Sequence, residues 1–441
     1  MNMCERLKKN SRWIAVLLLL GLSCLGARAQ TDGTYSGFSP YSVFGPGQMH
    51  QGGTAWNRGM GGVGIAARNH RFVNILNPAS VTARDSLSFM ADFGLDGRIS
   101  LFTEGDKKAL NTTFNIDDFV ISFPMWRHSA FMVGLMPVSD VGYNISYTEA
   151  DVFTGKRTFS SAGNGGIYQV FGAAAVTFWD RLSLGAQANY CFGNVNKQAV
   201  ILNEDESYRN TASGDSLQVH SFTGKLGLQY EQPLSHQTFL TLGVTYKFSA
   251  PMSGYRIGYK EYGSYYRNRT VDTLGLKNGL PVPKPRFGDE LGVGISYRRG
   301  DTFLAEVDYT RTSWLSSRLD QVSGFSNVGD VVFAPSVGQA FRAGVEFTPN
   351  RNDIRYFFRR CTYRMGAYFD QSYYTVDGAH VNAVGVTVGM TLPVFRWYNG
   401  LSLGLDFGRR GLATSQVKET YFGFNVGMNI FDIWFQKRPY E

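Results

Sequence analysis

The chain has 441 residues, of which 51 are glycine, 15% are aromatic and only 18% are charged. Soluble proteins average about 7% glycine and about 25% charged residues, so this composition argues against a disordered chain and against a helix-dominated one. The formal net charge is +8, but no lysine block or basic stripe carries it, so nothing indicates nucleic-acid binding.

The first 29 residues have the pattern of a secretory signal peptide. A basic start precedes an apolar stretch. Ala27 and Ala29 are small residues at the two positions that signal peptidase recognises, so we expect cleavage after Ala29. The alternative is a lipoprotein signal modified at Cys24, but the preceding residues fit a lipobox poorly. Cys191 and Cys361 then remain, in no spacing that indicates a disulfide framework or a cysteine zinc site.

Residues 30–85 do not alternate and are rich in glycine and proline. A segment of this length ahead of the first strand could form a periplasmic tail, or it could enter a wide barrel as a plug. Gly59, Gly61 and Gly64 fit a dinucleotide-binding pattern, with Asp85 at a suitable distance. No buried strand precedes these glycines, so we interpret them as tight packing within a plug.

From residue 86 onward, apolar residues alternate with small polar ones almost without a break. We count about fourteen strands, an even number, as bacterial single-chain barrels require. Their approximate centres are residues 91, 120, 134, 173, 187, 226, 243, 294, 307, 344, 366, 387, 404 and 425. Beyond the signal peptide, no segment approaches the roughly 20 apolar residues of a membrane helix, so an exported membrane protein of this kind must be a closed barrel.

The connections between these strands differ in length. Short links lie near 126–128, 179–181 and 299–301. Longer links lie near 194–216, 249–286 and 313–336. Short turns on one side and long loops on the other are typical of outer-membrane barrels, whose short turns face the periplasm.

A secreted soluble β-protein is the alternative, because alternation alone does not show whether the apolar or the polar face of the strands meets water. The number of strands, the small polar face and the aromatic residues near strand ends favour a membrane barrel. We therefore predict an all-β protein, a transmembrane antiparallel β-barrel of about 14 strands with an N-terminal luminal hatch (plug). The expected boundaries are 1–29 for the signal peptide, 30–85 for the hatch, 86–435 for the barrel and 436–441 for a C-terminal tail.

Two stretches resemble the FadL/TodX family of outer-membrane hydrophobic-compound transporters. The glycine-rich run from Arg58, continuing to the Asn-Pro-Ala motif at Asn77, is similar to the family's N-terminal hatch, and 123–142 looks like its second and third strands. The stretches 39–45 and 434–438 look like the Bacteroidota branch of such proteins. The chain departs from many such barrels in ending on Glu rather than Phe.

The resemblance implies passive uptake of hydrophobic compounds such as long-chain fatty acids, with a luminal hatch and a kinked third strand that opens sideways. It also implies capture by the third and fourth extracellular loops, which would be 194–216 and 249–286. Aromatic rings can bury an acyl chain, and basic groups can pair with its carboxylate. The expected ligand-binding residues are Phe72, Ile75, Leu76, Tyr255, Arg256, Tyr259, Lys260, Tyr262, Tyr266 and Arg267. The expected gating residues are Asn77 and Pro78, which would fix a turn in the hatch, and Gly134, Pro137 and Gly142 of the third strand, since proline and glycine weaken a strand.

Each of these roles has a plainer alternative. The loop at 249–286 could pack on itself or contact lipopolysaccharide, the hatch residues could only pack, and the third strand could simply bend at the barrel rim. Charged residues on the presumed luminal face are expected to anchor the hatch or brace the lumen. They are Glu306, Asp308, Arg342, Glu346, Arg364, Asp370 and Asp406.

We expect no catalytic residue, metal or cofactor, and hence no enzyme, because the six histidines lack metal-ligand spacing and no Gly-x-Ser-x-Gly elbow occurs. The expected protein is a monomeric outer-membrane channel of a Gram-negative, Bacteroidota-like bacterium. Its expected partners are hydrophobic or amphipathic small molecules, outer-membrane lipids and lipopolysaccharide. Two alternatives stay open: a FadL-fold barrel associated with type IX secretion, and a general porin or purely structural barrel.

Overall fold

The computed structural model describes residues 35–84, 88–151, 155–204, 207–262, 266–277, 280–322, 327–328, 331–394, 400–412 and 417–433. The predicted signal peptide, the tail at 436–441 and the stretch 434–438 lie outside these residues, so they stay predictions. Within the described part of the chain, no helix is long and apolar enough to cross a membrane.

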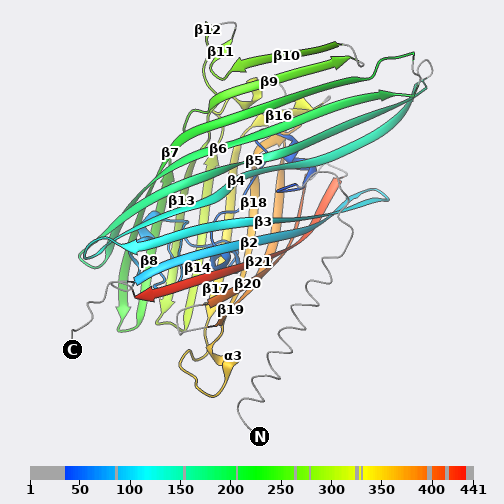
Figure 1. Ribbon diagram of the computed structural model, residues 1–441. Helices are drawn as coiled ribbons and strands as arrows, with labels where there is room; N and C mark the ends of the chain where they lie inside the picture. Colours follow the sequence, from blue (N-terminus) through cyan, green and yellow to red (C-terminus); the bar gives the residue numbers. More distant parts are fainter. Residues whose placement is uncertain are drawn as a thin grey trace, which may run out of the picture. The chain divides into compact units, whose positions relative to one another are not determined.

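Fourteen long strands pair edge to edge in a closed antiparallel barrel (Figure 1). In ring order they are β2 (Ser88–Glu104), β3 (Lys107–Pro124), β4 (Ser129–Asp151), β5 (Gly155–Phe178), β6 (Leu182–Asn203), β7 (Thr211–Ser235), β8 (Thr238–Lys247), β13 (Asp289–Arg299), β14 (Phe303–Ser313), β17 (Val337–Phe347), β18 (Thr362–Val376), β19 (Ala379–Pro393), β20 (Gly400–Leu412) and β21 (Val417–Ile433). The last strand pairs back with β2, from Ser88↔Ile433 to Glu104↔Val417, which closes the ring. The predicted 14-stranded barrel is therefore confirmed.

Shorter elements lie in the connections and ahead of the barrel. In the connections they are β9 (Ser253–Tyr262), β10 (Tyr266–Thr273), β11 (Leu276–Lys277), β12 (Leu280–Pro281), η4 (Leu319–Gln321), β15 (Asn327–Val328), β16 (Val331–Pro335) and α3 (Phe357–Arg360). Ahead of the barrel they are η2 (Pro40–Val43), β1 (Gln48–Met49), α2 (Ala55–Arg58) and η3 (Pro78–Thr82). We call residues 35–84 the N-terminal segment.

The alternation gives each barrel strand an inner and an outer face. On β6, Gln187 and Asn189 are buried on the inside, whereas Leu184, Tyr190 and Phe192 are exposed on the outside. An outward apolar face and an inward polar face suit a wall between lipid and a lumen. We call the end of the barrel with the tight turns 125–128, 179–181 and 300–302 the short-turn end.

The strands β4 to β7 extend much further than the sequence indicated. A membrane strand needs about 9–11 residues, but these four are 22 to 25 residues long. The prediction of a loop at 194–216 was wrong for most of this range, because β6 and β7 stay paired out to Ile201 and Thr211. Within 249–286, β9 and β10 form a hairpin that adds to the same sheet alongside β7.

The N-terminal segment packs against the inner face of the barrel. Its residues Tyr41, Val43 and Phe44 share one apolar core with Tyr143 of β4 and Tyr374 of β18. Near the other end of the segment, η3 contacts β5, β6 and β7. Segment residues therefore occupy space that would otherwise belong to the lumen.

Candidate functional site

The pairing between β3 and β4 breaks off early. These two strands pair only from Pro124↔Ala130 to Phe119↔Leu135, although β4 pairs with β5 along its whole length. Beyond that point, residues 107–118 of β3 and 136–151 of β4 share no ladder. We call this stretch of the wall the seam.

Each strand carries a bulge where the pairing ends. On β3 the register with β2 shifts at Asp117, and on β4 the register with β5 shifts at Val138, next to Pro137. A bulge adds one unpaired residue and turns a side chain toward a new direction. As a result, the consecutive residues Asp117 and Asp118 are both buried on the inside, which regular alternation forbids.

The N-terminal segment takes the place of the missing partner beside β4. Gln48 and Met49 of β1 pair with Asp140 and Ser139. Further along the edge, the Ser39 amide donates to the Gly142 carbonyl at 2.8 Å. The exposed edge of β4 is thus partly satisfied from inside the barrel, which is how a strand edge is kept from pairing elsewhere.

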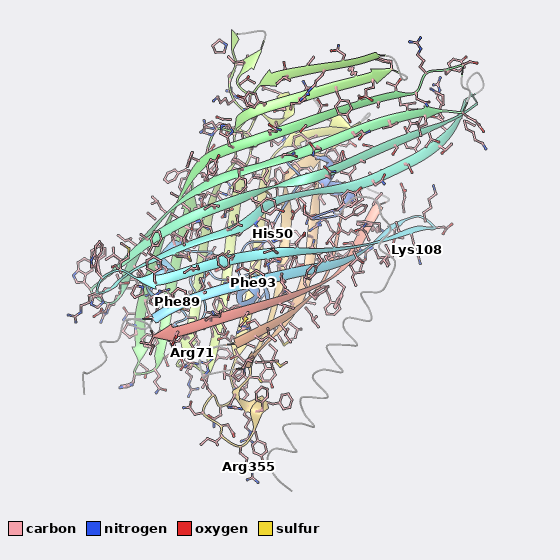
Figure 2. All side chains as sticks on the ribbon, viewed as in Figure 1. His50, Arg71, Phe89, Phe93, Lys108 and Arg355 are labelled. Atoms are coloured by element: carbon pink, nitrogen blue, oxygen red, sulfur yellow. The ribbon has the colours of Figure 1, made fainter. Side chains whose placement is uncertain are left out.

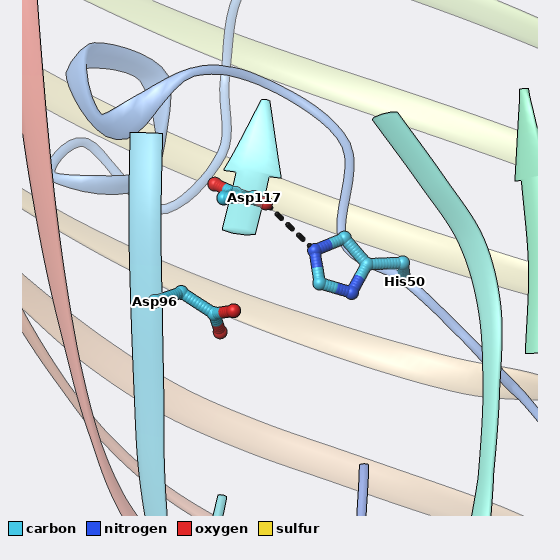
Figure 3. Close-up of side chains that lie close together, drawn as sticks. All are labelled: His50, Asp96 and Asp117. Atoms are coloured by element: carbon cyan, nitrogen blue, oxygen red, sulfur yellow. Dashed lines mark hydrogen bonds and ion pairs between the residues drawn. The ribbon is translucent and has the colours of Figure 1, made fainter. Parts of the chain in front are cut away.

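His50 connects the two sides of the seam. Its Nε2 lies 2.8 Å from Asp117 of β3, and its Nδ1 lies 3.3 Å from Asp140 of β4. Figure 3 shows the imidazole beside Asp117, with Asp96 of β2 close by. A single side chain of the N-terminal segment therefore bridges the strands whose direct pairing has stopped.

The same cluster has the donor set of a cation site. Ligand atoms of His50, Asp96 and Asp117 lie within 4.8 Å of one another. However, the guanidinium of Arg58 already lies among them, with Nη1 3.4 Å from Asp96 and Nη2 2.5 Å from Asp117. Because Arg58 supplies the positive charge, we assign no metal to this cluster.

The charge of His50 makes this bridge sensitive to pH. Burial and Arg58 act to lower the pKa of His50, but hydrogen bonds to Asp117 and Asp140 outweigh them and raise it from 6.5 to about 9. A raised pKa means that the stabilisation is complete below pH 6.5 and disappears as the pH rises through about 9. We expect the N-terminal segment to become more accessible to protease between about pH 7 and about pH 10.

His50→Gln provides the control for this prediction. Glutamine keeps a hydrogen-bond donor but does not titrate, so this variant is expected to lose the part of the pH response that arises from His50. The measurement is the rate of limited proteolysis of the folded barrel across the pH series. Identical pH responses in the parent chain and the variant would contradict the assignment.

Two carboxylates of β14 hold the glycine-rich turn of the segment. Asp308 accepts hydrogen bonds from the amides of Gly64 and Ile65 at 2.8 and 3.0 Å. Glu306 accepts from Ala66 and Ala67 at 2.6 and 2.9 Å. Both side chains point inward and are 2% exposed. These acids thus contact the segment, as expected for luminal anchors.

A second anchor joins α2 to β17 and β18. The Trp56 indole donates to Glu346 at 2.6 Å, and Arg364 donates to the same carboxylate at 2.8 Å. The Trp56 ring stacks on Phe72, over which the Arg364 guanidinium lies at 4.9 Å. Phe72, expected to bind a ligand, is here a buried part of this anchor.

The remaining charged residues of the predicted luminal set lie on the inner wall as well. Arg342 pairs with Asp370 at 2.9 Å, which links β17 to β18. Asp406 of β20 accepts from the Tyr368 hydroxyl at 2.8 Å. The first contact joins neighbouring strands, and the second joins β18 to β20 across β19, so both brace the wall itself.

A cavity of about 380 Å³ lies between the N-terminal segment and the wall. It reaches the seam from both sides, at Thr113 of β3 and at Met136 and Pro137 of β4. Ile75 and Leu76 of the segment contribute apolar surface to it. Lys225, Lys247, Glu290, Arg342 and Asp370 contribute charged surface. The cavity therefore combines apolar and charged walls, and pockets of this size accept small organic molecules.

The predicted gating residues gather where the segment meets the wall. A side chain at Gly142 would overlap the carbonyl oxygen of Gly37, and one at Gly134 would meet the ring of Phe171. The Asn77 side chain caps η3 and donates to the Ile65 carbonyl at 2.7 Å, while Pro78 begins that helix. The structure thus gives the glycines and Asn77 a packing or capping role, and their role in gating stays a prediction.

The predicted capture residues of β9 and β10 lie apart from the cavity. Arg256 is held between Asp215 and Asp272, at 2.5 and 3.0 Å. Tyr255 and Tyr262 are exposed. The backbones of Tyr259 and Lys260 pair with β7 and β10, and Tyr266 and Arg267 of β10 pair with Tyr262 and Glu261. No residue of β9 or β10 is among the cavity-lining residues of the described chain.

Several residues of the site were not singled out from the sequence. The pair Asp117–Asp118 interrupts the alternation of β3, and that irregularity could have indicated a bulge. His50, Arg58 and Asp140 have no such signal, because their partners lie far away along the chain.

Comparison with known proteins now identifies the family. The BamG family model matches residues 10–441. The chain belongs to the BamG family. None of the curated proteins compared with the chain matches it.

Several solved structures share the fold of this BamG-family chain. The Pseudomonas putida toluene transporter TodX is 16% identical, with a TM-score of 0.58, covering 88% of this chain and 99% of that one. The Ralstonia pickettii toluene transporter TbuX is 15% identical, with a TM-score of 0.57 and coverages of 86% and 98%. A Pseudomonas aeruginosa FadL homologue is 11% identical, with a TM-score of 0.56 and coverages of 88% and 100%. The expected FadL-like fold is therefore confirmed, while the Bacteroidota branch stays a prediction.

Proposed function

We propose that this BamG-family chain is an outer-membrane channel for the passive passage of hydrophobic or amphipathic compounds. In this proposal residues 30–85 act as a luminal hatch, and the seam between β3 and β4 is the lateral exit. The observation that carries it is the position of the cavity, whose lining includes Thr113 on one side of the seam and Pro137 on the other. Gln48, Met49 and His50 of the N-terminal segment line the same cavity, so the segment lies beside this route.

The outer surface beside the seam supports a lateral route. Leu110, Phe114 and Ile116 of β3 are 69%, 54% and 59% exposed on the outside of the barrel. A compound that leaves through the seam would enter a hydrophobic surrounding without crossing water. TodX and TbuX, which have the same fold, are named toluene transporters.

The walls of the cavity support an amphipathic, fatty-acid-like ligand. Met136, Ile75 and Leu76 offer apolar surface, and Lys225 and Lys247 face each other across β7 and β8. An acyl chain fits the first set, and a carboxylate fits ammonium groups. The occupied lumen disfavours a general porin, because the N-terminal segment fills part of the water path.

Narrowing the seam tests this proposal. Thr113 points inward beside the seam, and Thr113→Trp would fill the passage with an indole. We expect the initial rate of oleate uptake to fall about tenfold, as about 1.4 kcal/mol added to the barrier would cause. The measurement is uptake of radiolabelled oleate by cells or by proteoliposomes that contain the folded protein.

Thr112→Trp is the matched control. Thr112 is the neighbouring residue of β3 and is exposed on the outside, so the same substitution there leaves the passage open. We expect this variant to keep the uptake rate of the parent protein. Equal uptake by Thr113→Trp and the parent chain would refute the lateral route.

A further inference from the structure

The connection between β17 and β18 stands out at the short-turn end. Residues 348–361 form a folded loop with the one-turn helix α3, whereas β5–β6 and β13–β14 are joined by 179–181 and 300–302 alone. Figure 2 shows Arg355 of this loop well beyond the ends of the strands. We call residues 349–360 the basic loop. The channel function proposed above gives it no role.

The basic loop exposes aromatic and aliphatic side chains together with arginines. Ile354 and Phe358 are 93% and 69% exposed, and Tyr356 and Phe357 are exposed as well. Its charged residues are Arg351, Asp353, Arg355, Arg359 and Arg360, a net charge of 4 − 1 = +3.

Asp353, the single acidic residue of the basic loop, makes its contacts within the loop itself. The Asp353 carboxylate accepts the amides of Arg355 and Tyr356, each at 2.8 Å, and lies 3.4 Å from Arg359. Arg359 nevertheless stays 60% exposed. The outer surface of the loop is therefore cationic and aromatic, with little negative charge to balance it.

The loop is attached to the outer side of the wall. Thr362 and Arg364 on either side of Tyr363 face inward, so the Tyr363 ring faces outward. Tyr363 pairs with Phe347 of β17, whose side chain is exposed on the same face. The Tyr363 hydroxyl donates to the Phe358 carbonyl at 3.0 Å. This bond ties α3 to an outward-facing side chain at the start of β18.

Other turns at the same end show where the lipid surface lies. Trp126 and Trp179 are 76% and 84% exposed in their tight turns. Exposed tryptophans at the ends of membrane strands form the aromatic girdle at the lipid–water boundary. The basic loop presents its exposed aromatic residues and arginines at this same end of the barrel.

We propose that the basic loop is a binding site for anionic phospholipid headgroups in the leaflet at the short-turn end. Phe357 and Phe358 enter the boundary region, and Arg355, Arg359 and Arg360 bind phosphate oxygens. Guanidinium groups suit this ligand, because their planar donors match phosphate geometry. The inference rests on the membrane location in the proposed function, but not on the transport of any compound.

Native mass spectrometry of the full-length protein released from nanodiscs tests the site. The nanodiscs contain phosphatidylethanolamine and phosphatidylglycerol, and the variant is Arg355→Ala/Arg359→Ala/Arg360→Ala. We expect retention of phosphatidylglycerol to fall about fivefold for each arginine removed, the equivalent of about 1 kcal/mol each. The control is Arg127→Ala/Arg181→Ala/Arg299→Ala, which removes the same charge from two exposed turn positions and from the exposed last residue of β13 at the same end. Equal retention by the two variants overturns the proposal.

Photo-crosslinking in cells separates a lipid from a protein partner. Benzoylphenylalanine at position 358 is expected to yield phospholipid adducts on irradiation. Adducts with another protein and none with lipid would overturn the proposal in favour of a protein-docking loop. Oleate uptake by the loop variant is expected to equal that of the parent, so failure of the lipid site and failure of the channel function can be told apart.

Discussion

Replacing both anchor carboxylates, Glu306→Ala/Asp308→Ala, is expected to release the N-terminal segment from the wall. Four amides, from Gly64 to Ala67, would lose their acceptors in a buried place. An unsatisfied buried donor costs about 1–3 kcal/mol, so the four together amount to several kcal/mol. We expect rapid proteolysis of the segment and a larger conductance in planar bilayers, while the barrel keeps its heat-modifiable electrophoretic mobility.

Glu306→Gln/Asp308→Asn is the matched control for this change. Each amide side chain keeps a carbonyl oxygen that can accept the same hydrogen bonds. We expect this variant to protect the segment almost as well as the parent. If the double alanine variant were equally well protected, the segment would have to be held by other contacts.

Arg364→Met is expected to give the largest loss of barrel stability from a single substitution. Arg364 is 1% exposed and donates to Glu346, which also accepts from Trp56. Removing one partner of a buried ion pair costs about 3–5 kcal/mol, because the other charge stays behind. The free energy of unfolding in detergent micelles, measured by urea titration, should fall by this amount.

The variant Arg364→Met/Glu346→Gln separates the loss of charge balance from the loss of packing. It leaves no unpaired charge and keeps an acceptor for Trp56. We expect it to recover most of the stability, because replacing both partners of a buried pair is often close to neutral. A double variant as unstable as Arg364→Met would show that packing around the guanidinium is the cause.

The strands of the barrel could be predicted because each one carries its own signal. Residues 384–392 of β19 and 401–407 of β20 alternate between an apolar and a small or polar side chain, and that pattern needs no knowledge of the partner strand. The luminal acids Glu306 and Asp308 were identifiable for the same reason, since they interrupt the inward face of an otherwise regular strand.

The far ends of β4 to β7 escaped prediction because their outward residues are no longer apolar. On β6, Asn194, Asn196 and Gln198 follow Phe192 on the outer face. The inner residues still pack and the backbone ladder continues, but the hydrophobic contrast that reveals a strand is gone. The polar outward residues at the far ends of these strands were therefore interpreted as part of a loop.

The sequence by itself predicted a closed barrel of about fourteen strands, because a chain with period-two alternation and no membrane helix can satisfy its backbone in a membrane only as a closed barrel. Only the tertiary structure decided where that wall stays unpaired and what covers the opening. His50 is 67 residues from Asp117 and 90 from Asp140. Contacts over such separations depend on the register of strands and on the path of the N-terminal segment, and neither is encoded by the local pattern around His50.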